Sequence, residues 1–121
     1  MSLRLILDAA QRGANYLESM DTRRVGPSPA DLANLAHLAG PLPAGPTDPA
    51  TVLADLDRYG SPATIANSSG RYFGFVNGGS LPAARAANVL AAAWDQNVAL
   101  RAMSPVSAFL EDLALEWSRE L

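Results

Sequence analysis

Apolar residues recur at three- and four-residue steps over most of the chain, which is the spacing of one face of an α-helix. This pattern predicts helices at about residues 3–17, 29–39, 49–59, 82–101 and 105–121, with one or two further turns at 62–67. The sequence GPLPAGPTDP, which follows the second of these helices, is too rich in proline for regular structure. The sequence therefore predicts a mainly α fold made of helices and loops.

Four dipeptides combine a short polar side chain with a following proline, and each lies where a predicted helix or turn begins: Ser28-Pro29, Asp48-Pro49, Ser61-Pro62 and Ser104-Pro105. The polar side chain can accept a hydrogen bond from a free backbone N–H of the first turn, and proline lacks the donor that would stay unpaired there. We therefore expect four N-caps. Asp31, three residues after Ser28, completes an approximate capping box.

The last two predicted helices each carry an apolar stripe. We expect the helix at 82–101 to bury Ala83, Ala87, Leu90, Trp94 and Val98. The helix at 105–121 places on one face Val106, Phe109, Leu110, Leu113, Trp117 and Leu121. This second stripe is still in phase at the final residue, and acidic residues lie in the last turns, where the helix dipole disfavours them. The pattern predicts the N-terminal fragment of a longer protein; the alternative is a small protein with a frayed last helix.

The sequence RYFGFVNGGSLP, residues 71–82, joins three aromatic residues to a glycine-rich stretch. Asn77-Gly78 is a strong hairpin signal, yet an alanine-rich helix follows it instead of a second strand. Gly78 and Gly79 allow a ligand to approach the backbone closely, or a positive φ, and Ser80 can cap the next helix. The stretch is either the wall of a binding site or ordinary core followed by a turn into the helix.

The composition and charge of the chain bear on its partners and its location. The chain has 121 residues, enough for one domain, and a net charge of -3 without a basic stripe, so we predict no nucleic-acid partner. No apolar run approaches the length of a transmembrane helix, and the absence of cysteine fits a cytoplasmic protein. The basic pair Arg23-Arg24 suggests a solvated loop or a clamp on a nearby carboxylate.

All nine basic residues are arginine, so no side chain can form a Schiff base with an aldehyde cofactor. The single histidine, His37, cannot anchor a zinc site without further ligands and is expected to be structural. The sequence therefore predicts no catalytic, cofactor-binding or metal-ligating residue within this chain.

The segments RYFGFVNGGSLP, AAWDQN and MSPVSAFLEDLALEW occur in an order and spacing that resembles the N-terminal region of the group II pyridoxal-phosphate-dependent decarboxylases. This is the family of the aromatic amino acid, glutamate and related decarboxylases. The likeness covers about residues 60–121, and NYLESMDTRRVGPSP resembles the family's first helix and linker more weakly. The family often has His-Pro where this chain has Ser69-Gly70, which argues against the animal-type branches.

The resemblance implies a fold type I, aspartate aminotransferase-like enzyme that acts on an amino acid as a homodimer with pyridoxal phosphate. Residues 1–60 would form an N-terminal helical dimerisation arm. Residues 61–121 would provide the aromatic and glycine-rich loop and two helices that lead into a cofactor domain. The Schiff-base lysine of the family belongs to that domain and is outside these residues.

The resemblance also implies a substrate site. Phe75, Val76 and Asn77 would face the substrate or the neighbouring subunit, and Gly78 would allow close approach. Asn97 would bind the substrate carboxylate through its neutral amide. Alternatively, the patch Asp95-Gln96-Asn97 is an exposed helix face, and the whole chain is a truncated, non-catalytic helical module for dimerisation or interaction.

Overall fold

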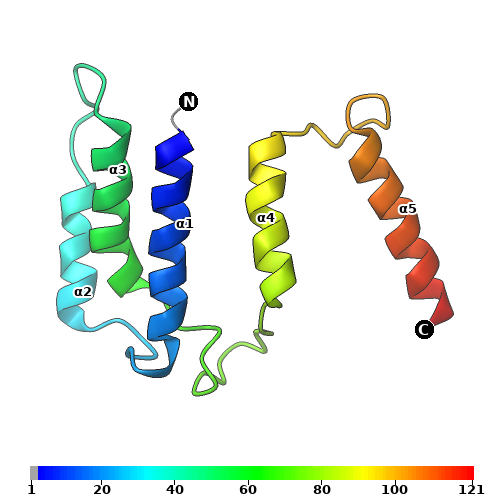
Figure 1. The fold of residues 1–121 in the computed structure, drawn as a ribbon. Helices are drawn as coiled ribbons and strands as arrows, with labels where there is room; N and C mark the ends of the chain where they lie inside the picture. The colour runs from blue at the N-terminus through cyan, green and yellow to red at the C-terminus, as the bar shows by residue number, and fades with distance from the viewer. Residues whose placement is uncertain (1–2) are drawn as a thin grey trace. The chain divides into compact units, whose positions relative to one another are not determined.

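The computed structural model describes residues 3–121, and every regular element in that range is helical. The α-helices in Figure 1 are α1 (Leu3–Glu18), α2 (Pro29–Asn34), α3 (Pro49–Asp55), α4 (Pro82–Trp94) and α5 (Pro105–Glu120). Three short 3₁₀ segments lie at η1 (Ser19–Asp21), η2 (Leu35–Leu38) and η4 (Ser61–Ala63), and a π-helical turn forms η3 (Leu56–Gly60). The mainly α class is confirmed for the described residues.

The chain forms two compact units, one that ends at Gly79 and one that runs from Ser80 to Leu121. The first contains α1 to α3, and the second contains α4 and α5. Residues 71–79, the aromatic segment, thus form the end of the first unit. The sequence suggested a division of roles at residue 60, and that assignment stays a prediction.

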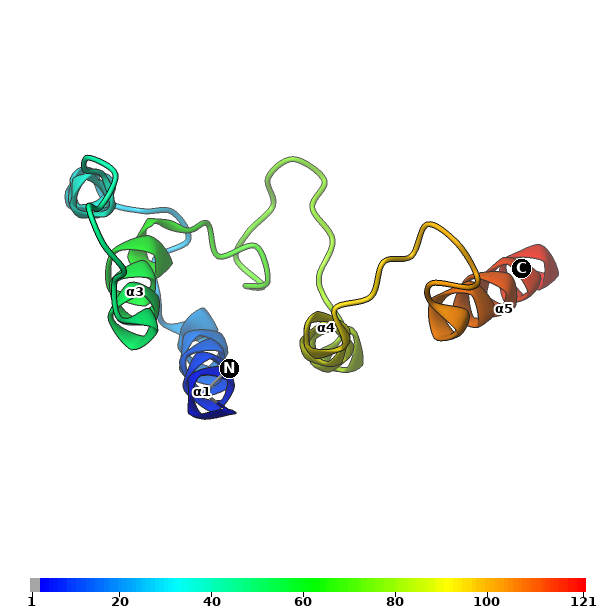
Figure 2. The ribbon, with the colours of Figure 1, turned by 90° about the horizontal axis from the view of Figure 1, so that it is seen from above.

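In the first unit, α1 and α3 pack side by side, as both views show (Figures 1 and 2). The turn η2 packs against η3, and α2 packs against η4. Among the described residues, the buried apolar side chains are Met20, just after α1, and Ala66, just after η4. Ala66 is also fixed through its backbone N–H, which donates to the carbonyl of Val25 at 2.9 Å.

Two of the four expected N-caps are present. The Ser28 hydroxyl accepts from the Asp31 N–H at 3.1 Å, and the Asp31 carboxylate accepts from the Ser28 N–H at 2.7 Å, which completes the capping box. The Asp48 carboxylate accepts from the Thr51 N–H at 3.1 Å. Pro29 and Pro49 occupy the first turns of α2 and α3, as expected.

At Ser61 and Ser104 the expected cap hydrogen bond is absent, although Ser104 holds the N-cap position of α5 and Pro105 follows it in the first turn. Ser61 instead donates its hydroxyl to Asp57 at 2.7 Å, and the Ser104 hydroxyl pairs with that of Ser107 at 2.8 Å. Ser80 does not cap α4 either, because the N-cap position is held by Leu81. At Ser61 and Ser104 a nearby side chain competes for the hydroxyl, and at Ser80 the helix starts one residue too late for the cap. The sequence pattern reveals neither effect.

Helix α4 is shorter than predicted. It ends at Trp94, because Asp95 adopts the left-handed conformation with φ 49° and ψ 48°. Val98 therefore lies outside the helix. The expected burial of the stripe is also wrong, since Leu90 is 55% and Trp94 is 49% exposed.

Helix α5 follows the expected course, with its apolar residues on a helix of 16 residues. Phe109 and Trp117 are each 62% exposed, and neither α4 nor α5 contains a buried residue. No helix within residues 3–121 combines the length and apolar character needed to cross a membrane.

Candidate functional site

The aromatic segment ends in a tight turn made by two bulky residues. The Asn77 N–H donates to the Gly74 carbonyl at 3.2 Å, so Phe75 and Val76 are the central residues of the turn. Both have positive φ, 55° and 56°, as in a type I′ turn, which usually carries Asn-Gly. The turn thus forms two residues before the Asn77-Gly78 signal, and it presents two apolar side chains outward: Phe75 is 92% exposed and Val76 is 102% exposed.

The glycines of this segment do not behave as the sequence suggested. None of the described glycines has positive φ, so this alternative for Gly78 and Gly79 is wrong, and close approach of a ligand stays a prediction. An added Cβ at either position would meet nothing within 4 Å. At Gly74, in contrast, an added Cβ would lie 2.6 Å from the Tyr72 hydroxyl oxygen. Gly74 therefore leaves room for the Tyr72 ring to lie against the backbone.

The ordinary-core interpretation of the aromatic segment is also wrong, because Phe73 and Phe75 are 91% and 92% exposed. An open pocket of about 660 Å³ lies beside the segment instead. Its lining combines three aromatic rings with apolar and neutral polar side chains: Tyr16, Met20, Thr64, Ile65, Asn67, Ser68, Tyr72, Phe75 and Asn77.

The expected site residues fall in different places. Phe75 and Asn77 line the pocket, whereas Val76, in the centre of the same turn, and Gly78, just after the turn, do not. Asn97 belongs to the second unit, in the loop after α4, where its side-chain oxygen accepts from the Ala99 N–H at 3.1 Å. Because α4 ends at Trp94, the interpretation of residues 95–97 as a helix face is wrong.

The walls of the pocket are joined by side chains that are far apart in the sequence. The Tyr16 and Thr64 hydroxyls lie 2.7 Å apart. The Arg23 guanidinium lies 4.0 Å from the centre of the Tyr16 ring and donates to the Ser61 carbonyl at 2.6 Å. Arg71 donates to the carbonyls of Met20 and Arg23. The cation–π contact and the backbone bonds replace the carboxylate clamp considered for Arg23.

Sequence reasoning missed Tyr16 and Thr64 as parts of this pocket, whereas Tyr72 belongs to the aromatic run that was expected to suit a pocket wall. Tyr16 and Thr64 are 48 positions apart, and no local pattern connects them. The residue in the sequence that could have pointed to this pocket is Arg71, next to Tyr72. It is a lone cation in an otherwise apolar segment, and such a charge needs a partner.

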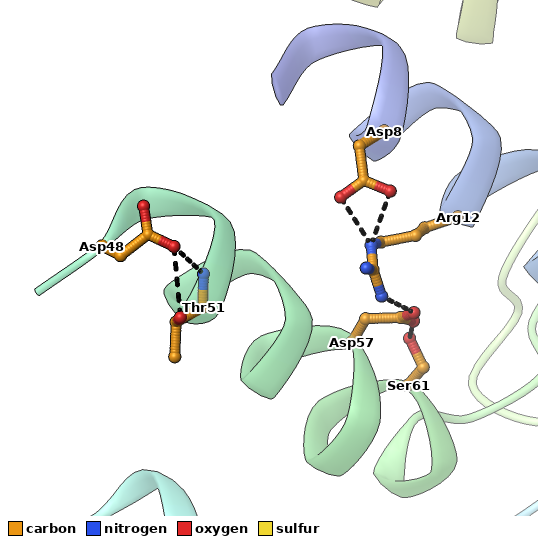
Figure 3. A network of polar contacts seen from close by, with 6 residues as sticks. All are labelled: Asp8, Arg12, Asp48, Thr51, Asp57 and Ser61. Carbon is orange, nitrogen blue, oxygen red and sulfur yellow. Dashed lines mark hydrogen bonds and ion pairs between the residues drawn. The ribbon is translucent and has the colours of Figure 1, made fainter. Parts of the chain in front are cut away.

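A second, mostly apolar hollow of about 370 Å³ lies between α1 and the segment from α3 to η4, and a charged network borders it (Figure 3). Arg12 bonds Asp8 through Nε at 3.1 Å and Asp57 through Nη1 at 3.0 Å. Hydrogen bonds from the Ser61 hydroxyl and from Arg12 lower the pKa of Asp57. The network ties α1 to the π-helical turn and serves to hold the first unit together.

The described residues do not fit pyridoxal phosphate. The sequence contains no lysine for a Schiff base, and no cationic side chain lines the pocket to bind a phosphate. No group of three or more potential metal ligands occurs within residues 3–121. The lining of the pocket therefore offers neither a Schiff-base lysine nor a cation for the cofactor's phosphate.

Comparison with known proteins yields no relative: no family model, curated protein or solved structure matches this chain significantly.

Proposed function

We propose that this chain is the N-terminal portion of a fold type I, pyridoxal-phosphate-dependent amino acid decarboxylase, where it contributes a wall of the substrate pocket and contacts of a homodimer. The observation that carries the proposal is the position of Phe75 and Asn77. These two residues, which the resemblance marks as substrate-facing, line one pocket together with Tyr16 of α1.

The part of this chain in the reaction is binding and orientation. Pyridoxal phosphate supplies an electron sink for decarboxylation when it is bound, and residues outside this chain would hold it. Phe75 offers an exposed ring, and the Asn77 amide can donate and accept hydrogen bonds. Holding a substrate in a reactive orientation contributes substantially to catalysis even when the residues concerned perform no bond breaking.

The exposed apolar faces of the second unit support the proposed dimer. Phe109 and Trp117 on α5 and Trp94 on α4 are between 49% and 62% exposed. Large apolar side chains that are exposed together on one helix face can mark an interaction site. A second copy of the chain would cover these faces. We also propose a cytoplasmic location, which the absence of cysteine supports, and no nucleic-acid or membrane partner.

A second candidate function is a non-catalytic helical module for dimerisation or interaction. The absence of lysine favours it, because the chain alone cannot bind the cofactor covalently. The same exposed faces of α4 and α5 would then be the functional surface, and the pocket would be incidental.

The decisive experiment starts from the protein purified from its native source through an N-terminal tag. Intact mass, borohydride-reducible pyridoxal phosphate and release of carbon dioxide from amino acids are measured. We expect a mass above that of a 121-residue chain, bound cofactor and carbon dioxide release. A mass equal to that of this chain, without cofactor or activity, would reject the decarboxylase and favour the interaction module.

The dimer is tested with the 121-residue chain by light scattering at micromolar concentration. We expect association that weakens in a variant with Trp94→Ser and Trp117→Ser. Leu42→Ser is the matched control, because Leu42 is 94% exposed in the proline-rich loop of the first unit. A monodisperse monomer, or equal weakening in the control, would argue against dimer contacts through α4 and α5.

A further inference from the structure

Asn77 is followed by glycine, the context in which the side-chain amide of asparagine is lost most readily. In this reaction the backbone nitrogen of the following residue attacks the side-chain amide carbon, so a bulky following residue hinders it. Glycine has no side chain to obstruct the attack and leaves the backbone free to reach the required conformation. The other five asparagines precede larger residues: Tyr16, Leu35, Ser68, Val89 and Val98.

The structure leaves the reacting groups at Asn77 accessible. Asn77, Gly78 and Gly79 are exposed and lie outside every regular element of the described chain. An added Cβ at Gly78 would meet nothing within 4 Å. Among the described residues, the Gly78 N–H finds no acceptor and the Asn77 side chain forms no hydrogen bond. The attacking nitrogen and the carbon that it attacks are therefore both free to move toward each other.

The other asparagines are less well placed for this reaction. Asn15 and Asn88 lie within α1 and α4, where helical hydrogen bonds fix the backbone that would have to move. The Asn97 side-chain oxygen accepts from the Ala99 N–H at 3.1 Å, and a β-branched valine follows it. Asn67 is exposed and precedes a serine, so it is the best internal comparison for Asn77.

We propose that Asn77 is a site of spontaneous deamidation in the folded protein. The Gly78 nitrogen loses its proton to hydroxide and forms a bond to Cγ of Asn77. The bond from Cγ to Nδ2 breaks, ammonia leaves with a proton from water, and a cyclic succinimide remains. Water then opens the ring. Cleavage between Cγ and the Gly78 nitrogen gives aspartate at position 77, and cleavage at the main-chain carbonyl gives isoaspartate, whose backbone runs through Cγ.

Either product places a carboxylate in the lining of the pocket. Asn77 belongs to that lining, and none of the other residues that line the pocket is acidic or basic. Deamidation therefore turns an uncharged lining into an anionic one, which repels anions and attracts cations. Isoaspartate also adds a methylene to the backbone directly after the turn at Phe75 and Val76. The reaction needs only this chain and water, so it is independent of the proposed function.

The first experiment incubates the 121-residue chain at mildly alkaline pH and follows each asparagine by peptide mass spectrometry, with chromatography to separate aspartate from isoaspartate. We expect Asn77 to deamidate at least about tenfold faster than Asn67 or Asn97, because only Asn77 precedes glycine. Its rate should lie within about threefold of the rate in urea, since an open segment gains little protection from folding. Faster reaction at Asn67, or strong protection of Asn77 by folding, would overturn the proposal.

Gly78 and Gly79 provide a matched pair of variants. Both are exposed, neither has a positive φ, and an added Cβ has open space at each, so alanine fits at both positions. Only Gly78 supplies the attacking nitrogen. Gly78→Ala should slow deamidation of Asn77 at least roughly fivefold, and Gly79→Ala should slow it less than about twofold. Equal rates in the two variants would contradict attack by the Gly78 nitrogen.

The effect on the pocket is measured by amide NMR of the ¹⁵N-labelled chain before and after ageing. Signals of residues 64–68, which are remote from position 77 in the sequence but share the pocket lining, should shift as deamidation proceeds. Asn77→Gln is the control, because its longer side chain closes a ring far more slowly, and its signals should stay unchanged. Unshifted signals of residues 64–68 in deamidated chain, or equal shifts in the control, would show that the new carboxylate does not lie in the pocket.

Discussion

The two units of the chain are held together in different ways. In the first unit, polar side chains connect segments that are far apart: Arg12 reaches Asp57 across 45 positions, and Arg71 reaches the Met20 carbonyl across 51. In the second unit, the ion pair joins Arg101 to Asp112, eleven positions apart, and loops such as Asn97–Ala99 bond within themselves. The first unit therefore has tertiary contacts between distant segments, whereas these contacts of the second unit are local.

This difference shows what an apolar stripe does and does not reveal. Both units contain stripes at helical spacing, and both form helices. In the second unit, however, neither α4 nor α5 has a buried residue. Isolated helices of fewer than about 12–15 residues are marginal in water, and α4 has 13. A stripe thus indicates which face favours burial, but it does not show that anything within the unit covers it.

The largest expected effect is a difference in hydrogen exchange between the units. In dilute, monomeric chain, amides of α1 and α3 should be protected at least about tenfold more than amides of α4 and α5, because local opening of uncovered helices costs little. Exchange followed by NMR measures this. If a second copy covers the second unit, its protection should rise with chain concentration while that of the first unit stays constant. Equal protection in the monomer would show that the second unit is stable alone.

The next largest effect comes from breaking one ion pair in each unit. Arg12 and Asp57 have side chains 31% and 32% exposed, whereas those of Arg101 and Asp112 are 65% and 63% exposed. Arg12→Met leaves Asp57 with only Ser61 and should destabilise the first unit by about 1–2 kcal/mol. Arg101→Met should cost about 0–0.5 kcal/mol, as for exposed pairs. Urea unfolding, followed through amide signals of each unit, measures the loss of unfolding free energy in both variants. Equal losses would contradict the difference between the units.

Acid should weaken the first unit through Asp57. Its pKa is lowered in the folded chain by Ser61 and Arg12. A carboxylate with a lowered pKa contributes stability above its unfolded pKa of about 3.9, and this contribution is lost as the pH falls through the folded pKa. The urea midpoint of the first unit should therefore fall on acidification below about pH 4.

Asp57→Asn should lower the stability at neutral pH and flatten this dependence. Asp55→Asn, two residues away, is the control and should retain the acid sensitivity. Some sensitivity remains in both variants, because Ser28 lowers the pKa of Asp31. An acid response that is unchanged by Asp57→Asn would show that the network does not link α1 to the π-helical turn energetically.

Periodicity and proline position were enough to predict the helices and the caps at Ser28 and Asp48, because these depend on residues within one turn of each other. The end of α4 escaped prediction, since it depends on the conformation of one residue, Asp95. The pocket could be predicted in part: Phe75 and Asn77 belong to a conspicuous segment. Tyr16 could not, because a wall built from positions 48 apart arises only from tertiary packing.

The smallest expected effect concerns backbone strain, which both units contain. Val76 and Asp95 both lie in the left-handed region, with φ 56° and 49°. Left-handed backbone costs an L-residue roughly 1–2 kcal/mol, but Asp can offset part of this through local hydrogen bonds, and Val cannot. Val76→Gly should therefore stabilise the first unit by about 0.5–1 kcal/mol, after the greater flexibility of glycine in the unfolded chain is subtracted. Val76→Ala, which removes the β-branch but keeps an L-residue at a fully exposed position, should give a smaller gain than Val76→Gly.

At Asp95 the effect of the charge on stability must be distinguished from that of the backbone conformation. An acidic residue at the end of α4 interacts unfavourably with the helix dipole. Asp95→Asn removes the charge and keeps a residue that tolerates the left-handed region. The difference between Asp95→Gly and Asp95→Asn then isolates the backbone and should be about 0–0.5 kcal/mol. A larger gain at Asp95 than at Val76 would reverse the comparison, because the strain would then be stored at a helix end instead of in the turn that carries Phe75. A larger gain at Val76 would place the strain in the turn that carries Phe75, beside the pocket.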